Sequence, residues 1–133
     1  MTLIEELKSD HKKLLEKFLE IQKIGIAKKE GKDELYSIKN LLLSHLKKED
    51  VSIYPVLQEK AKNDSSLQIK LNLFTKEMNT INNTIIKFFE KYSLTNELDI
   101  EKNLQFIKEI TSIITILRER IRKEEEYLYP EYK

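Results

Sequence analysis

The 133-residue sequence contains no cysteine, so disulfide bonds, thiolate metal sites and thiol chemistry are all excluded. It contains only two glycines and two prolines. Because these residues mark turns and breaks, their scarcity favours a few long helices over many strands. No apolar run approaches the roughly 18 residues that a membrane span needs, and the charged start resembles no secretory signal. We therefore expect a single cytoplasmic domain over residues 1–133, with no membrane partner.

Neither sign of charge is in excess, since 24 Lys and Arg residues face 23 Asp and Glu residues and leave a net charge of +1. Such a balance produces no broad electric field that would attract nucleic acid or anionic lipid. We therefore expect no nucleic-acid partner for this chain.

Apolar residues recur at helical spacing in four stretches, which polar turns separate. Thr2 and Glu5 form a capping box that starts the first stretch, and Gly31 is predicted to end it. Pro55 is predicted to kink the second stretch. The short connections make consecutive helices antiparallel neighbours, so we expect an all-α, up-down-up-down antiparallel four-helix bundle. The predicted helices span about residues 2–29, 33–62, 66–92 and 97–127.

A repeated motif ends the second and fourth predicted helices, because residues 45–55 align without gaps to residues 120–130. Both copies carry a Glu, a Tyr and a Pro in register, which similar composition alone does not explain. The matched pairs are Glu49 and Glu124, Tyr54 and Tyr129, and Pro55 and Pro130. The copies differ at their first position, which is His45 in one and Arg120 in the other.

The spacing of the motif places polar side chains on otherwise apolar helix faces. Residues four apart share a face, so His45 projects with Glu49, and Arg120 projects with Glu124. His11 lies on the apolar stripe of the first helix. Polar groups on such faces are costly unless they are paired or bind a metal. In an antiparallel bundle, three helices would deliver these groups to one layer.

Each of these residues also has an ordinary explanation when it is taken alone. A lone histidine is commonly just hydrogen-bonded, and His45 with Glu49 is a common helix-surface pair. Arg120 with Glu124 matches an i,i+4 salt bridge worth a few tenths of a kcal/mol. Glu124 lies in a run of three Glu residues, which is typical of a solvated face, and Tyr129 is expected to pack at the end of the bundle. The repeat and the convergence on one layer favour a joint site.

These residues resemble the hemerythrin-like (HHE cation-binding) family, a set of di-iron four-helix bundles, and the resemblance covers nearly the whole chain. It implies that one iron is held by a histidine from each of the first two helices and by two carboxylates. At the matching positions, the resemblance gives a complete ligand set for that iron. The set is His11, His45, Glu49 and Glu124.

The second iron of the family lacks its histidines here, because Met78 and Arg120 stand at those positions and the chain has only two histidines. A thioether is a soft ligand that suits iron poorly, and a guanidinium stays charged and binds no metal. Arg120 is predicted to hydrogen-bond the oxygens of Glu49 and Glu124 that would otherwise bridge to the second metal. A fixed positive charge would then replace a metal ion.

The expected function is that of a non-enzymatic metal-binding domain with one iron, or another divalent ion, in a two-His, two-carboxylate site. Imidazole and carboxylate suit iron, zinc or manganese, so the residues alone leave the metal open. Oxygen carriage in the family relies on two irons, which argues against that role here and leaves sensing open. The alternative is a metal-free structural or partner-binding bundle, in which Arg120 and a protonated histidine neutralise the carboxylates. An oxidase- or reductase-like activity is the third, least supported option.

Overall fold

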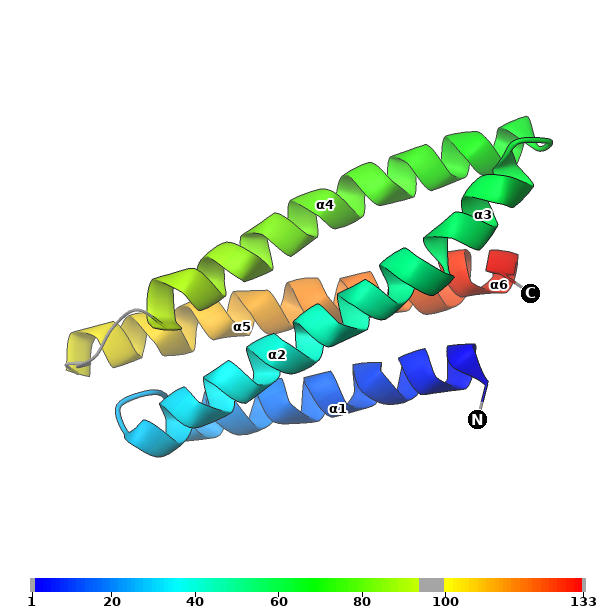
Figure 1. Cartoon of the computed structure of the whole chain (residues 1–133). Coiled ribbons are helices and arrows are strands. Elements are labelled where there is room, and N and C mark those ends of the chain that lie inside the picture. The colour runs from blue at the N-terminus through cyan, green and yellow to red at the C-terminus, as the bar shows by residue number, and fades with distance from the viewer. Residues whose placement is uncertain (1, 94–99, 133) are drawn as a thin grey trace.

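The computed structural model of the protein describes residues 2–93 and 100–132. Within these residues the structure is helical and has no strand. Four helical arms lie side by side and alternate in direction along the chain (Figure 1). The predicted all-α four-helix bundle is confirmed for this part of the chain. The elements are α1 (Leu3–Ile24), α2 (Lys29–Ser52), α3 (Tyr54–Ala61), α4 (Ser65–Ser93), α5 (Ile100–Lys123), the π-helix η1 (Glu124–Leu128) and α6 (Tyr129–Tyr132).

The second and fourth arms are each made of more than one element. The second arm is α2 followed by α3, and the fourth is α5 followed by η1 and α6. α1 packs against α2 and α5, while α4 packs against α5, α2 and α3. Both chain ends therefore lie at the end of the bundle where α3 meets α4 (Figure 1). No helix in the described ranges combines the length and the apolar character needed to cross a bilayer.

The first turn of the bundle differs from the prediction. The capping box of Thr2 and Glu5 is present, but α1 ends at Ile24 and Gly25 caps it with a φ of 72°. Gly31, predicted to end the first helix, lies inside α2 instead. A side chain at Gly31 would place its Cβ 1.8 Å from the carbonyl oxygen of Gly25. Gly31 is needed because the backbone of α2 comes close to the backbone of Gly25 there. Gly25, and not Gly31, caps the end of α1.

The repeated motif takes two different shapes in its two copies. As predicted, Pro55 breaks the second arm: α2 ends at Ser52 and α3 starts at Tyr54 with the proline in its first turn. In the fourth arm the chain passes instead through the π-helix η1, which the sequence pattern did not predict. The predicted turn at residues 93–96 and the predicted start of the fourth helix at residue 97 fall mainly outside the described residues.

Two apolar clusters make up the core, with a polar layer between them. In α1, the buried His11 lies between Leu14 of one cluster and Leu7 of the other. In the second arm, the polar residues likewise lie between Leu42 and Ile53. The bundle therefore encloses the layer in apolar packing on both sides. Its buried polar residues are Asp10, His11, His45, Glu49, Arg120 and Glu124.

Candidate metal centre

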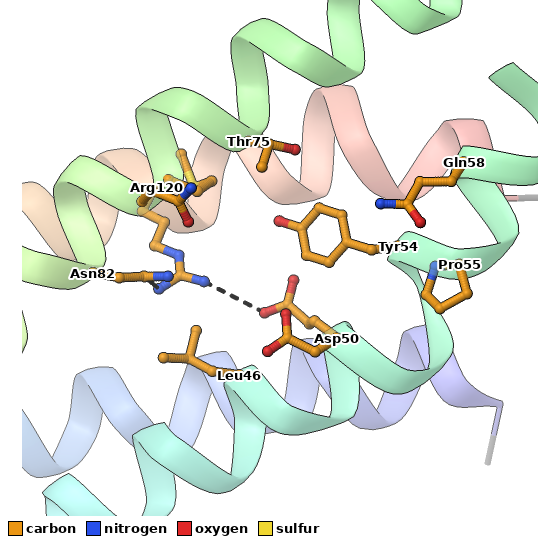
Figure 2. Close-up of a pocket in the computed structure, with 11 residues that line it drawn as sticks. Leu46, Asp50, Tyr54, Pro55, Gln58, Thr75, Asn82 and Arg120 are labelled. Atoms are coloured by element: carbon orange, nitrogen blue, oxygen red, sulfur yellow. Dashed lines mark hydrogen bonds and ion pairs between the residues drawn. The ribbon is translucent and has the colours of Figure 1, made fainter.

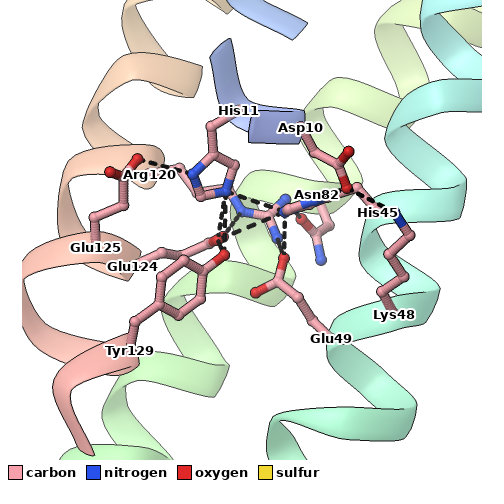
Figure 3. A network of polar contacts seen from close by, with 10 residues as sticks. All are labelled: Asp10, His11, His45, Lys48, Glu49, Asn82, Arg120, Glu124, Glu125 and Tyr129. Atoms are coloured by element: carbon pink, nitrogen blue, oxygen red, sulfur yellow. Dashed lines mark hydrogen bonds and ion pairs between the residues drawn. The ribbon is translucent and has the colours of Figure 1, made fainter. Parts of the chain in front are cut away.

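Four side chains from three helical arms meet in the polar layer (Figure 3). His11 comes from α1, His45 and Glu49 come from α2, and Glu124 is the first residue of η1. One potential ligand atom from each lies within 4.8 Å of the others. All four residues are 1–2% exposed. The structure thus brings together the four residues that the resemblance named as ligands; that they bind a metal stays a prediction.

The spacing of these atoms fits a metal centre. Nε2 of His11 lies 3.0 Å from Nε2 of His45 and 3.0 Å from Oε2 of Glu124, and Nε2 of His45 lies 2.8 Å from Oε1 of Glu49. Metal bonds to His and carboxylate of about 2.0–2.2 Å would set neighbouring ligands at right angles about 2.8–3.1 Å apart. The contacts have the lengths expected of adjacent ligands.

Glu49 supplies a second observation that fits a cation site. Both of its carboxylate oxygens are buried, and neither accepts a hydrogen bond of acceptable geometry from the part of the chain described. Oε1 of Glu49 lies 2.8 Å from Nε2 of His45 and 3.6 Å from Nη2 of Arg120. These are contacts between charged groups whose geometry is not that of a hydrogen bond. Burying a carboxylate oxygen that accepts no hydrogen bond lowers the stability of the fold, and coordination to a metal ion would offset that cost.

Each histidine has a second carboxylate behind it. Nδ1 of His45 lies 3.1 Å from Oδ2 of Asp10, and Nδ1 of His11 lies 2.9 Å from Oε2 of Glu125. Asp10 is itself held by Lys48 at 3.0 Å. A carboxylate beside Nδ1 favours the neutral tautomer that carries its proton on Nδ1. The lone pair of Nε2 is then available to bind a metal. Asp10 and Glu125 were not predicted as site residues, and their only signal in the sequence is that each adjoins a predicted ligand.

Arg120 lies on the opposite side of the two glutamates and is 3% exposed. Its Nε donates to Oε1 of Glu124 at 2.5 Å, as the sequence predicted. Its Nη2 reaches Glu49 only as an ion pair at 3.6 Å, so the predicted second hydrogen bond is absent. Nη1 donates to Asn82 of α4. The guanidinium therefore pairs with Oε1 of Glu124, the outer oxygen, while Oε2 of the same carboxylate faces His11.

Met78 is buried in the apolar cluster near the chain ends, at 2% exposed, and carries no polar contact into the layer. Glu77, which could have supplied an oxygen, points outward and forms an ion pair with Lys123. The side of the layer that faces α4 thus lacks a second set of metal ligands among the described residues.

A cavity of about 230 Å³ borders the layer on this same side (Figure 2). Its lining includes Glu49 and Arg120 of the layer, Tyr54 and Gln58 of α3, and Asn79 of α4. The close-up shows the Tyr54 ring directed into the space between α3 and α4, toward Thr75. By the family resemblance, a second metal ion would lie on this side of the layer. In this chain the Arg120 guanidinium and a polar cavity are found there.

The positive and negative side chains of the layer can balance one another without a metal ion. Burial would raise the pKa of Glu124, but the charge of Arg120 and hydrogen bonds with the histidines hold it well below its usual value. Burial and the charge of Glu124 raise the pKa of Glu49. Burial lowers the pKa of His45, yet contacts with both glutamates outweigh it and raise that pKa to about 10. In the metal-free protein, His45 and Arg120 are therefore the balancing cations at neutral pH.

One of three comparisons with known proteins gave a match. A family profile described as the hemerythrin HHE cation binding domain matches residues 2–132. Searches of curated proteins and of solved structures gave no match. The profile covers essentially the whole bundle, including all three arms that supply the cluster. The chain therefore belongs to the hemerythrin HHE cation-binding domain family.

Proposed function

We propose that this domain binds one iron, or another divalent metal ion, through His11, His45, Glu49 and Glu124. The observation that carries the proposal is the buried meeting of four ligand atoms within 4.8 Å, at the separations of adjacent metal ligands. The carboxylates behind both histidines add to it, because they aim the two Nε2 atoms at the same point. Iron is chosen by the family resemblance, while the ligand types also suit zinc or manganese.

A single ion is proposed because the second half of the family's site has been replaced. Arg120 donates to the outer oxygen of Glu124, and Met78 is directed into apolar packing. The sequence has no further histidine from which a second set could be built. A guanidinium beside the glutamates repels a second cation and satisfies the oxygen that would bind it.

The proposed role is binding or sensing, without catalysis. A metal here would supply a Lewis-acid or redox centre, and the chain's own residues would hold it and exclude bulk water. The apolar clusters on both sides enclose the layer, while the cavity beside Glu49 borders it with polar side chains. A cytoplasmic location remains part of the proposal, consistent with the absence of cysteine.

The test is the metal content of protein expressed with added iron. We expect about one metal ion per chain by elemental analysis, and its loss in Glu49→Gln, which removes one ligand charge with little change in shape. Glu59→Gln is the matched control, since the Glu59 side chain is 73% exposed on α3. Circular dichroism would establish that each variant is folded. Two irons per chain, or full metal content in Glu49→Gln, would contradict the proposal.

A metal-free bundle with a structural or partner-binding role is the second candidate. It is favoured by the balance of charge in the layer, where Arg120 and a protonated His45 already oppose Glu49 and Glu124. A buried network whose charges oppose one another in this way needs no metal ion for neutrality. Absence of metal in freshly purified protein, together with no change in melting temperature when iron, zinc or manganese is added, would support this candidate.

A further inference from the structure

Tyr129, which was predicted from the sequence to pack at the end of the bundle, places a fifth potential ligand atom at the cluster. Its hydroxyl donates to Oε2 of Glu124 at 2.9 Å and lies 3.2 Å from Nε2 of His11. The residue is 1% exposed, and its ring stacks on the His11 ring with centroids 5.7 Å apart and planes 10° apart. Figure 3 shows the hydroxyl pointing into the space between the ligands.

The π-helix explains how Tyr129 reaches this position. In an α-helix, residues four apart stack on one face, so a residue five positions after Glu124 would turn away from the cluster. In η1 the hydrogen bonds run from residue i+5 to residue i, and the Tyr129 N–H donates to the Glu124 carbonyl. Residues five apart then lie one above the other. The π-turn therefore brings the two side chains onto the same face.

The other copy of the repeat shows that the motif alone does not produce this contact. Tyr54 stands five residues after Glu49, as Tyr129 does after Glu124. There the helix breaks at Ile53, and Tyr54 starts α3 and lines the cavity (Figure 2). Tyr54 and Tyr129 thus occupy the same position of the repeat, but only the Tyr129 hydroxyl is seen to contact His11 and Glu124 in the described residues. π-turns are rare and frequently mark functional sites.

We propose that Tyr129 is a fifth protein ligand, which binds a ferric ion through its phenolate oxygen. The proposal rests on the metal site proposed above. The two contacts of the hydroxyl, 2.9 and 3.2 Å, are close to the separation of about 2.8–3.1 Å expected between adjacent ligands at metal bonds of about 2.0–2.2 Å. An anionic oxygen is also a ligand type that suits a ferric ion, as the haem tyrosinate of catalase illustrates.

Coordination exchanges a proton for the metal at one atom. The Oη–H bond of Tyr129 breaks, the Oη–iron bond forms, the proton leaves to solvent, and no electron is transferred. In the metal-free protein, burial and the charges of Glu124 and Glu49 raise the pKa of this hydroxyl. The charge of a bound cation reverses that preference and favours the phenolate.

The experiment compares three proteins loaded with ferric citrate: the natural chain, Tyr129→Phe and Tyr54→Phe. A phenolate bound to a ferric ion absorbs visible light by charge transfer, and resonance Raman excitation in that band enhances tyrosine ring modes. We expect the band in the natural protein and in Tyr54→Phe, and its loss in Tyr129→Phe. Each substitution removes one hydroxyl and keeps the ring, so Tyr54→Phe controls for a hydroxyl lost near the layer.

Iron content measured on the same samples separates the two proposals. Iron bound to the natural protein without the band, or a band that survives in Tyr129→Phe, would overturn the tyrosine assignment and leave the metal site standing. Absence of iron from all three proteins would overturn the tyrosine assignment and the choice of iron, and absence of every other metal as well would overturn the metal site. Iron retained by Tyr129→Phe with the band gone is the result that supports Tyr129 as a ligand and the other four residues as the remaining set.

Discussion

In the proposed metal site, Arg120 occupies the position that would limit the polar layer to one metal ion. Its guanidinium lies 2.5 Å from one oxygen of Glu124 and 3.6 Å from Glu49, so its charge stands where a second cation would bind. Burial of this group is tolerated because it has partners on both α2 and η1 and donates to Asn82 of α4. Under the proposed function, His45 would be a ligand, while Arg120 at the matching position of the other repeat copy would take the place of a second metal ion.

Arg120→His is predicted to raise the metal content above that of the natural protein. The change removes the fixed charge, frees the outer oxygen of Glu124 and supplies an imidazole at the matching position of the repeat. Adding Met78→His on α4 is expected to raise it further, toward two ions per chain, because that residue lines the same cavity. The measurement is metal per chain by elemental analysis after loading with ferrous iron.

Arg122→His is the matched control for this prediction. The Arg122 side chain is 43% exposed and pairs with Glu119 and Glu126 at the surface, away from the layer. The control should leave the stoichiometry unchanged. Equal metal content in Arg120→His and the natural protein would show that the guanidinium does not limit the site.

At the scale of the elements, apolar periodicity and i,i+4 spacing were sufficient to predict the bundle and the meeting of its polar residues. Both depend on regular helical geometry, which the sequence specifies locally. His45 with Glu49, and Arg120 with Glu124, share helix faces as expected. Their convergence with His11 follows from the antiparallel order of the arms.

The features that could not be predicted depend on departures from regular geometry or on contacts between arms. The two copies of the repeat share Glu, Tyr and Pro, yet one forms a helix break and the other a π-helix. The contact of Tyr129 with the cluster depends on which of these two shapes forms, and a local sequence pattern does not specify that. Asp10 and Glu125 contact histidines on other arms, so their part in the site required the assembled bundle.

The turn between α1 and α2 gives a test of packing at this scale. Gly31→Ala is predicted to lower the free energy of unfolding by about 1–3 kcal/mol, the range for overpacking a close contact. The added Cβ would lie 1.8 Å from the Gly25 carbonyl oxygen, so the two backbones must separate. Urea unfolding followed by circular dichroism measures the change.

An exposed position on the same helix provides the control. Ser37→Ala, on the outside of α2, should leave stability nearly unchanged. In an open helix position, alanine would stabilise relative to glycine by about 1 kcal/mol. A more stable Gly31→Ala protein would therefore show that the close approach of the two backbones is not maintained.

At the scale of the whole molecule, the polar layer lies between the two apolar clusters. Its residues come from three arms, and Arg120 links it to the remaining arm through Asn82 of α4. Charge within the layer is balanced by His45 and Arg120, and of these only His45 can lose its proton below the range in which arginine titrates. The pKa of His45 is raised to about 10 in the folded protein, against about 6.5 for an unperturbed histidine. The protonated form therefore stabilises the folded state, and the balance depends on pH.

The sign of this dependence follows from the raised pKa. In the metal-free protein, the stabilisation from His45 is complete below about pH 6.5 and decreases as pH rises toward about 10, by at most about 1.4 kcal/mol per pH unit. A metal ion takes the place of that proton, so the metal is expected to bind more tightly as pH rises through the same range. The unfolding free energies with chelator and with metal should therefore diverge between pH 7 and pH 9.

Urea unfolding at pH 7 and pH 9, with chelator or with saturating metal, measures this divergence. His45→Gln should weaken the pH dependence of the metal-free protein, because it removes the titrating group and keeps a polar side chain in the layer. A metal-free protein that becomes more stable from pH 7 to pH 9 would contradict the assignment of positive charge to His45. Parallel curves with and without metal would mean that the ion does not displace the His45 proton, and so does not bind at His45.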